Sequence, residues 1–355
     1  MSTWERLAEL PLQVERCTLR GLELPFSEEF VRSTTLITLH GDGHEGTGED
    51  VTYDGLDHVA FQDAAGSLEL GGSYTLDSFS RHLEEAELWP APPVREPSRA
   101  YRRWAFESAA LDLALRQEGR SLAEQLEREP APLTYVVSMR LGSFDSEEPE
   151  TPERLVRLVE RYPRTRFKLD PTNTWSDDLI GELAATGVVD SLDLKGQYKG
   201  TPVDVATDPE LYAKVCEAFP DAWLEDPDLN DQTRPVLEPH RDRVTWDAPI
   251  HSVADVLALE WKPRMVNVKP SRFGPLRELF AAYDFCAERG IGAYGGGQTE
   301  LGVGRDHIQY LASLFHPDTP NDVAPREFNH PQVPDGLPES PLAPRPAATG
   351  FRFAS

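Results

Sequence analysis

Charged residues stand at the ends of four short apolar segments. Asp193 ends the first, Glu225 the second, Asp247 the third and Lys269 the fourth. The step from Asp193 to Glu225 is 32 residues, and the two later steps are 22 residues each. If these segments are neighbouring parallel strands, their ends meet at one edge. Three carboxylates there would suit a hard divalent cation, and the lysine beside them could carry a proton.

The intervals between these segments have room for helices, which is the pattern of repeated βα units. Further strands are expected at residues 133–139, 166–170, 291–294 and 322–324. Helices are expected to open at 151–154, to span 179–186 with Gly187 as the cap, and to span 303–315. Eight strands over about 190 residues are what a closed βα barrel needs.

The first 127 residues have a different pattern. Residues 14–19 and 35–39 alternate apolar and polar side chains, as half-buried antiparallel strands do. Helices are expected over 73–90, from an N-cap at Ser98 to near Gly119, and over 122–126. We therefore expect an α+β domain over 1–127 and a barrel over 128–328. The Pro-rich tail, 329–355, is expected to cross the surface and return to the first domain as a last strand at 350–353.

The composition excludes several classes of function. A net charge of −26 argues against nucleic acid and anionic membranes as partners. The only cysteines are Cys17, Cys216 and Cys286, an odd and widely spaced set that indicates a reducing compartment without disulfides. There is no basic-then-apolar leader at the N-terminus and no apolar run of membrane-spanning length. A cytoplasmic location is therefore expected.

Six sequence patterns follow one another in the order of a known superfamily. They are Gly46–Glu49 (G-x-G-E), Trp104–Ala114 (the helix that leads into the barrel), Gly119–Leu122 (G-x-P-L), Glu225–Pro227 (E-x-P), Trp246–Ile250 (D-E-S) and Val266–Gly274 (V-N-x-K-x-x-R-x-G). Each alone is weak, but the ordered set resembles the enolase superfamily, closest to its muconate-cycloisomerase and o-succinylbenzoate-synthase branch.

This resemblance implies a modified TIM (βα) barrel with an α+β capping domain. It also implies Mg²⁺ held by Asp193, Glu225 and Asp247, with Lys168 and Lys269 as the catalytic lysines. Members of the superfamily remove a proton α to a substrate carboxylate, and the cation stabilises the charge of the resulting ene-diolate.

Two positions depart from the superfamily pattern. Its second strand usually reads Lys-x-Lys, whereas residues 166–170 read Arg-Phe-Lys-Leu-Asp. Lys168 is either the second lysine, with Arg166 in place of the first, or the first, with Asp170 where the base should be. On the third strand Lys195 stands where asparagine is usual, and it could bind a second substrate carboxylate or replace the metal. The substrate-binding candidates are Arg166, Lys195, Gln298 and Glu300.

Three functions remain open at this point. The first is a Mg²⁺-dependent lyase or isomerase of the cycloisomerase, syn-dehydratase or racemase type, acting on a small carboxylate. The second is a catalytically degenerate barrel that binds a ligand or acts as a scaffold. The third is an unrelated sugar-processing barrel with two catalytic acids and no metal. The loop near 26–32 is expected to close over the mouth, residues 295–297 to bring backbone close to a ligand, and a homo-oligomer is left open.

Overall fold

The N-terminal part of the chain is a three-stranded antiparallel sheet covered by helices. The computed structural model describes residues 1–355 except 27–29, 65–67, 143–149, 202, 331 and 355. The sheet has the order β2-β3-β4, and β1 pairs with β5 at one side. The elements are η1 (Trp4–Arg6), β1 (Pro11–Val14), β2 (Arg16–Pro25), β3 (Val31–Gly41), β4 (His44–Asp50), α1 (Gly55–Asp63), β5 (Gly72–Thr75), α2 (Leu76–Glu85), α3 (Ser98–Gln117) and α4 (Leu122–Leu126).

Helix α3 packs directly against β4, and two glycines make this possible. A Cβ atom at Gly48 would lie 1.9 Å from the carbonyl oxygen of Ala105 on α3. At Gly46 it would lie 2.2 Å from the backbone nitrogen of Leu113. The helix in turn buries Trp104, Phe106 and four of its alanines in the core. The G-x-G part of the motif therefore sets the distance between helix and strand.

The rest of the chain is a βα barrel. Five parallel strands have the order β10-β9-β8-β7-β6, and β11 pairs in parallel with β12. The strands are β6 (Val136–Met139), β7 (Arg166–Leu169), β8 (Val189–Asp193), β9 (Trp223–Glu225), β10 (Val244–Thr245), β11 (Met265–Asn267) and β12 (Gly292–Tyr294). Backbone hydrogen bonds close the ring: Asn267 N donates to Trp246 O, Asp322 N to Gly295 O, and Val136 N to Asn321 O.

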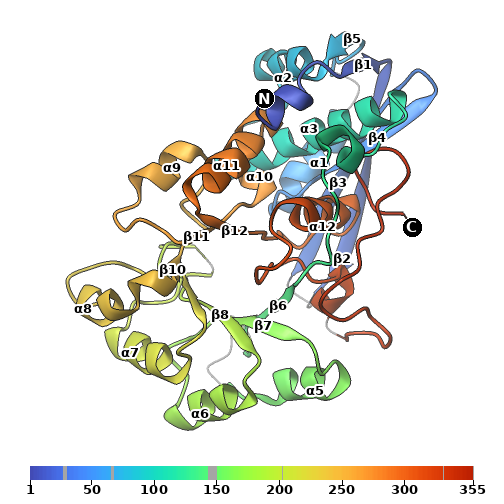
Figure 1. Ribbon diagram of the computed structural model, residues 1–355. Coiled ribbons are helices and arrows are strands. Elements are labelled where there is room, and N and C mark those ends of the chain that lie inside the picture. Colours follow the sequence, from blue (N-terminus) through green and yellow to red (C-terminus); the bar gives the residue numbers. More distant parts are fainter. Residues whose placement is uncertain (27–29, 65–67, 143–149, 202, 331, 355) are drawn as a thin grey trace.

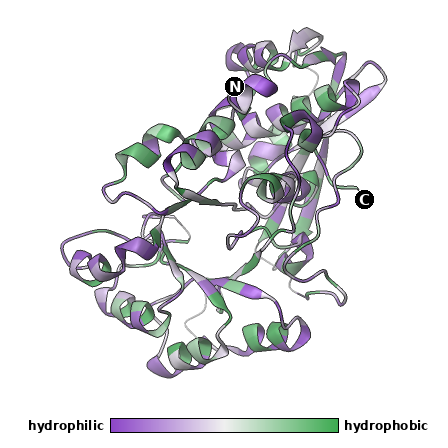
Figure 2. Ribbon diagram, viewed as in Figure 1, coloured by the Kyte–Doolittle hydropathy of each residue, from purple (hydrophilic) through white to green (hydrophobic). Residues whose placement is uncertain are grey.

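The helices of the barrel follow one another around the outside of the strands (Figure 1). They are α5 (Glu153–Arg161), α6 (Asp177–Thr186), α7 (Pro209–Ala218), α8 (Arg234–Leu237), η3 (Glu238–Arg243), α9 (Val253–Ala258), α10 (Pro270–Phe273), α11 (Leu276–Arg289), α12 (Val303–Phe315) and η4 (Arg326–Asn329). Hydrophobic and hydrophilic residues alternate along them, as expected for helices with one face on a core (Figure 2).

The expected fold class is confirmed, with local corrections. Residues 72–75 form β5, so the predicted helix over 73–90 is α2 alone, which ends at Glu85. The eighth strand is reduced to single bridges at Asn321 and Asp322, because the chain turns into η4 soon after them. The tail does return to the first domain, but as a bridge between Gly350 and Ser121 rather than as a strand. None of the described helices is both long and apolar enough to cross a membrane.

Candidate active site

Acids and cations, most of them buried, gather at the C-terminal ends of the barrel strands. We call this set the mouth cluster: Lys168, Asp170, Asp193, Lys195, Glu225, Asp226, Asp247, Lys269, Arg272 and Asp322. The register of the parallel strands β8 and β9 places Asp193 and Glu225 side by side at the centre of this cluster. Lys168 on β7 forms an ion pair with Glu225, and its Nζ lies 3.3 Å from Asp193 Oδ2 and 3.6 Å from Asp322 Oδ2. All three predicted metal ligands and both predicted catalytic lysines therefore lie in one buried cluster.

Asp247 lies on the other side of the cluster and is surrounded by donors. Lys269 Nζ lies 2.9 Å from its Oδ2, and Arg272 Nη1 lies 2.8 Å from its Oδ1. The hydroxyl of Tyr198 donates to Oδ2 at 3.1 Å and accepts from Arg272 Nη2 at 3.1 Å. Despite burial, Arg272 and Lys269 hold the pKa of Asp247 well below its usual range.

Lys195 reaches into the cluster from the loop after β8. Its Nζ lies 2.5 Å from Asp193 Oδ2 and 3.4 Å from Asp170 Oδ2. Its backbone has φ of 53°, in the left-handed region, and its N–H donates to Asp193 Oδ1 at 3.2 Å. Lys195 and Lys168 together overcome the effect of burial and lower the pKa of Asp193.

Three carboxylates of the cluster lie close enough to share one cation. Single oxygens of Asp193, Glu225 and Asp226 all lie within 4.8 Å of one another. Asp226 belongs to this group of three, whereas Asp247, the third carboxylate that we predicted, does not. The left-handed backbone of Asp226, with φ of 48°, aims its carboxylate at the backbone N–H groups of Asp247 and Ala248, each at 2.8 Å. Tyr294 donates to Glu225 Oε2 at 2.5 Å.

Carboxylates outnumber cations in the mouth cluster. Six carboxylates face three lysines and one arginine, so the carboxylates exceed the cations by two. Burial first, and then the neighbouring acids, raise the pKa of Glu225 and bring that of Asp226 to about 7. A buried set of oxygen donors with this surplus fits a hard divalent cation.

The two predicted catalytic lysines differ in their surroundings. Burial favours the neutral form of Lys168, but Glu225, Asp193 and Asp322 outweigh it and raise its pKa well above the usual value. Burial also acts on Lys269; although Asp247 opposes it, the nearby cations Arg272 and Lys168 add to the effect of burial, and the pKa of Lys269 is lowered. Of these two lysines, Lys269 is therefore the one whose surroundings ease the loss of a proton.

The other candidates lie at different depths. Gln298 and Glu300 are buried in the loop after β12, where Gln298 accepts from Ser271 at 2.7 Å and Glu300 pairs with Arg305 at 2.8 Å. Arg166 lies outside the mouth cluster. It stands at the opposite end of β7, where its guanidinium holds Asp190 and the carbonyl of Gly187. Arg166 lies two residues before Lys168, so both side chains are on the same face of β7, but Arg166 is nearer the N-terminal end of the strand. This position does not support a role for Arg166 in binding substrate.

In the comparisons with known proteins, separate family models match the barrel and the capping domain. A family model described as "Domain of unknown function (DUF8230) C-terminal domain" matches residues 129–330, and the corresponding N-terminal model matches 5–125. The chain belongs to the DUF8230 family. Among curated proteins, this DUF8230 chain is 28% identical to an o-succinylbenzoate synthase from Geobacillus stearothermophilus, over 68% of each chain. It is 26% identical to an N-succinylamino acid racemase from Thermus thermophilus, over 88% of the chain and 86% of the relative.

Solved structures show the same fold. An enolase-superfamily member from Enterococcus faecalis V583 matches with a TM-score of 0.66 and 18% identity, over 96% of this chain and 94% of its own. Muconate lactonizing enzyme from Pseudomonas putida matches with a TM-score of 0.61 and 18% identity, over 86% of each chain. The DUF8230 chain therefore has the fold of these enolase-superfamily proteins, which is the fold that its ordered motifs led us to expect.

Several residues of the DUF8230 site had no predicted role. Asp226 lies in the Glu225–Pro227 pattern and Arg272 in the Val266–Gly274 pattern, so the sequence could have pointed to them. The spacing of these patterns does not show that the two side chains reach the mouth cluster. Tyr198 had no signal. Gly296 lets the loop after β12 pack closely, because a Cβ atom there would lie 2.6 Å from Asn267 Nδ2 and 2.7 Å from Lys269 Cε.

The capping domain of the DUF8230 chain touches the site loop through Arg32. Its guanidinium is buried and donates to the carbonyls of Gln298 and Thr299 at 2.9 and 3.3 Å, and to that of Val51 in its own domain at 2.7 Å. Part of the loop predicted to close over the mouth, residues 27–29, lies outside the described residues. Arg32 nevertheless fixes the end of that loop to the barrel.

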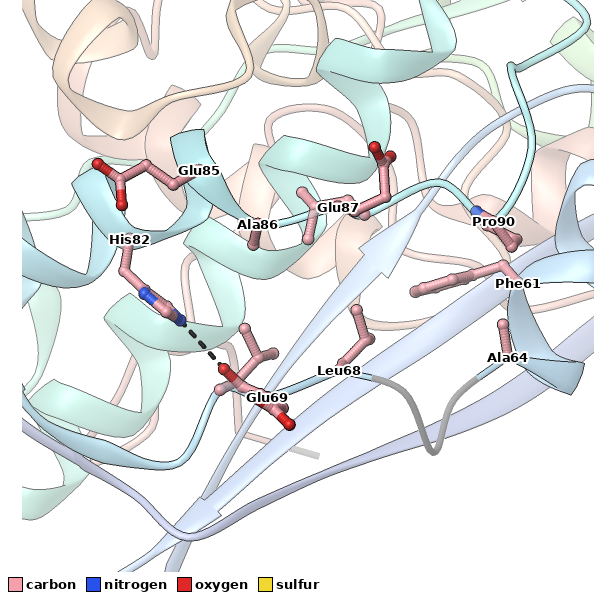
Figure 3. Close-up of a pocket in the computed structure, with 11 residues that line it drawn as sticks. Phe61, Ala64, Leu68, Glu69, His82, Glu85, Ala86, Glu87 and Pro90 are labelled. Carbon is pink, nitrogen blue, oxygen red and sulfur yellow. Dashed lines mark hydrogen bonds between the residues drawn. The ribbon is translucent and has the colours of Figure 1, made fainter.

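A separate cavity lies within the capping domain. It has a volume of about 520 Å³ and is lined by Phe61, Leu68 and Leu70 with Glu69, His82 and Glu85 at its edge (Figure 3). His82 Nε2 contacts the carbonyl of Glu69 at 3.1 Å, so the ring is held by the cavity wall. None of the residues that line it belongs to the mouth cluster.

Proposed function

We propose that the protein is a Mg²⁺-dependent lyase or isomerase that removes a proton α to the carboxylate of a small-molecule substrate. One observation carries the proposal: Lys168 and Lys269 are buried beside a triad of carboxylates at the C-terminal strand ends of a βα barrel. Active sites of barrels of this kind lie at that end.

Asp193 and Glu225 would hold the Mg²⁺, with Asp226 or Asp247 as the third carboxylate. The ion would stabilise negative charge on the substrate carboxylate as the α-proton leaves. The surplus of two carboxylates over cations in the mouth cluster supports a divalent rather than a monovalent ion.

The lysines would handle the proton. Lys269 Nζ would accept it, because Arg272 and burial favour its neutral form. Asp247 orients both Lys269 and Arg272 through separate oxygens. Lys168 would remain protonated and hold Glu225 in place. With a lysine on each side, the same site could return a proton to either face, as a racemase does, or release a leaving group, as a lyase does.

The direct test is exchange of the α-proton in D₂O. N-Succinylamino acids are the first substrates to try, because a curated relative is named for racemising them. With Mg²⁺ present, ¹H NMR should show loss of the α-proton signal. Lys269→Met should abolish the exchange, whereas Lys262→Met, a lysine outside the mouth cluster, should leave it unchanged. Exchange that survives Lys269→Met would contradict the assigned role of this lysine.

A second function rests on a different observation. Each predicted metal ligand already contacts a cation of the protein: Lys195 at Asp193, Lys168 at Glu225, and Arg272 at Asp247. A barrel that compensates its own acids in this way could bind a carboxylate ligand without turning it over. Binding of an N-succinylamino acid without any exchange of its α-proton, with or without Mg²⁺, would favour this ligand-binding function over the enzyme.

A further inference from the structure

Lys195, which departs from the superfamily pattern, contacts Asp170, another residue of the mouth cluster. Asp170 follows β7 and Lys195 follows β8, so they come from neighbouring strands. Lys195 Nζ lies 2.5 Å from Asp193 Oδ2 and 3.4 Å from Asp170 Oδ2. One ammonium group therefore lies between a proposed metal ligand and a carboxylate that is not one.

Asp193 cannot hold this ammonium and a divalent ion in the same way. Its Oδ2 contacts both Lys195, at 2.5 Å, and Lys168, at 3.3 Å. A third cation, with two charges, on the same oxygen would be repelled strongly in a buried site. Lys168 is also held by Glu225 and Asp322, so Lys195 is the cation that can leave.

Asp170 is a ready acceptor for the displaced ammonium. Its Oδ1 is buried and has no hydrogen-bond partner among the described residues. Its Oδ2 is already 3.4 Å from Lys195 Nζ. The side chain of Lys195 is also the most exposed of the four cluster cations, at 14% against 4% for Lys168 and 8% for Lys269. A small rotation of the lysine stem would satisfy Asp170 and free Asp193.

We propose that Lys195 is a mobile internal counter-ion, which occupies Asp193 in the absence of a divalent cation and moves to Asp170 when the cation binds. The inference rests on the proposed Mg²⁺ site. It explains why Asp170 lies beside Lys195: a lysine next to a metal ligand needs a second carboxylate to receive it. The consequence is that the protein binds the cation more weakly than it would without the lysine.

Calorimetry with MgCl₂ on the full chain tests this. Lys195→Met should bind Mg²⁺ at least about tenfold more tightly than the wild type, since removal of one unit charge a few ångströms away is worth more than a factor of ten in a buried site. Asp170→Asn should bind it more weakly, because the displaced lysine loses its acceptor. In the Lys195→Met background, Asp170→Asn should have a much smaller effect, which a double-mutant cycle measures.

Controls separate this inference from the function on which it rests. Lys199→Met removes a lysine of the same loop that pairs with Asp228 instead, and it should leave the Mg²⁺ affinity unchanged. Lys195→Asn repeats the measurement with the residue that is usual in the superfamily, in case the methionine variant folds poorly. Equal or weaker Mg²⁺ binding by both Lys195 variants would overturn the counter-ion role while the metal site stands. No Mg²⁺ binding by the wild type or by either variant would overturn the metal site itself.

Discussion

At the scale of single residues, the mouth cluster shows how neighbours decide the chemistry of a side chain. Lys168 and Lys269 are both buried lysines at strand ends. Lys168 contacts three carboxylates, and its positive charge compensates theirs. Lys269 contacts one carboxylate, that of Asp247, which Arg272 also contacts. The first lysine is therefore expected to act mainly as a fixed cation and the second as a proton acceptor.

The fixed charge of Lys168 leads to a prediction about stability. Lys168→Met should lower the free energy of unfolding by about 3–5 kcal/mol, because it leaves buried carboxylates without their cation. Urea unfolding followed by circular dichroism measures this. Lys214→Met is the matched control, since Lys214 pairs with Asp177 and Glu210 at the surface and should matter much less. If both variants lose the same small amount, the buried charge of Lys168 is not needed for folding.

Metal ions should add to stability through the same carboxylates. Mg²⁺ at a concentration 100 times its Kd should raise the free energy of unfolding by about 2.7 kcal/mol, because it binds only the folded chain. Thermal unfolding with Mg²⁺ or with EDTA measures the difference. Glu225→Gln should remove the effect of Mg²⁺ on the melting temperature, whereas Glu339→Gln, on the tail, should retain it. A Mg²⁺ effect that persists in Glu225→Gln would place the ion elsewhere.

At the scale of elements, strand ends could be predicted from sequence and side-chain directions could not. The charged ends of apolar runs gave the positions of β8, β9, β10 and β11 because a buried strand is a short and strong pattern. The same pattern does not show that Asp226, one residue beyond Glu225, adopts a left-handed backbone and joins the triad. Nor does it show that Arg166, two residues before Lys168, reaches Asp190 instead of the mouth.

The contact of α3 with β4 gives a prediction at this scale. Gly48→Ala should lower the free energy of unfolding of the capping domain, because the added Cβ would lie 1.9 Å from the backbone oxygen of Ala105. The loss should be several times the difference of about 0.5–1 kcal/mol that usually separates glycine from alanine. Gly181→Ala in α6 is the opposite case, since a Cβ there meets nothing within 4 Å. It should stabilise the chain by about 0.5–1 kcal/mol through helix propensity. Thermal unfolding of the two variants should therefore shift in opposite directions, and a shared direction would contradict the close packing at β4.

At the scale of the whole molecule, the tail joins the capping domain to the barrel. Asp112 on α3 accepts from the backbone N–H of Phe351 at 2.8 Å and pairs with Arg352. The ring of Phe351 stacks on His307 of α12 at 4.3 Å and lies edge-on to Trp104 of α3 at 6.3 Å. We call these contacts of Phe351 and Arg352 with α3 and α12 the tail joint. The sequence predicted the return of the tail but not the tail joint, because a Pro-rich segment with single buried residues has no periodic pattern.

The joint makes the stability of the protein depend on pH. Both ring nitrogens of His307 are buried and have no hydrogen-bond partner among the described residues, and burial lowers the pKa of this histidine to about 3. In the unfolded chain the pKa of histidine is about 6.5. Below that value the unfolded chain binds a proton that the folded chain excludes. The free energy of unfolding should therefore fall as the pH decreases from about 6.5 toward 3, by about 1.4 kcal/mol per unit for this one group.

His307→Phe separates this contribution from the other acid-sensitive groups. Phenylalanine can keep the stack on Phe351 and has no polar nitrogen to leave unpaired, so it should be tolerated at pH 8. At pH 5 the variant should gain stability relative to the wild type, because nothing at this position then takes up a proton on unfolding. Urea unfolding at both pH values measures the difference, and His251→Phe, at an exposed position, is the control. An equal change at pH 5 and pH 8 would mean that His307 takes up a proton in the folded protein at the same pH as in the unfolded chain, which would contradict its lowered pKa.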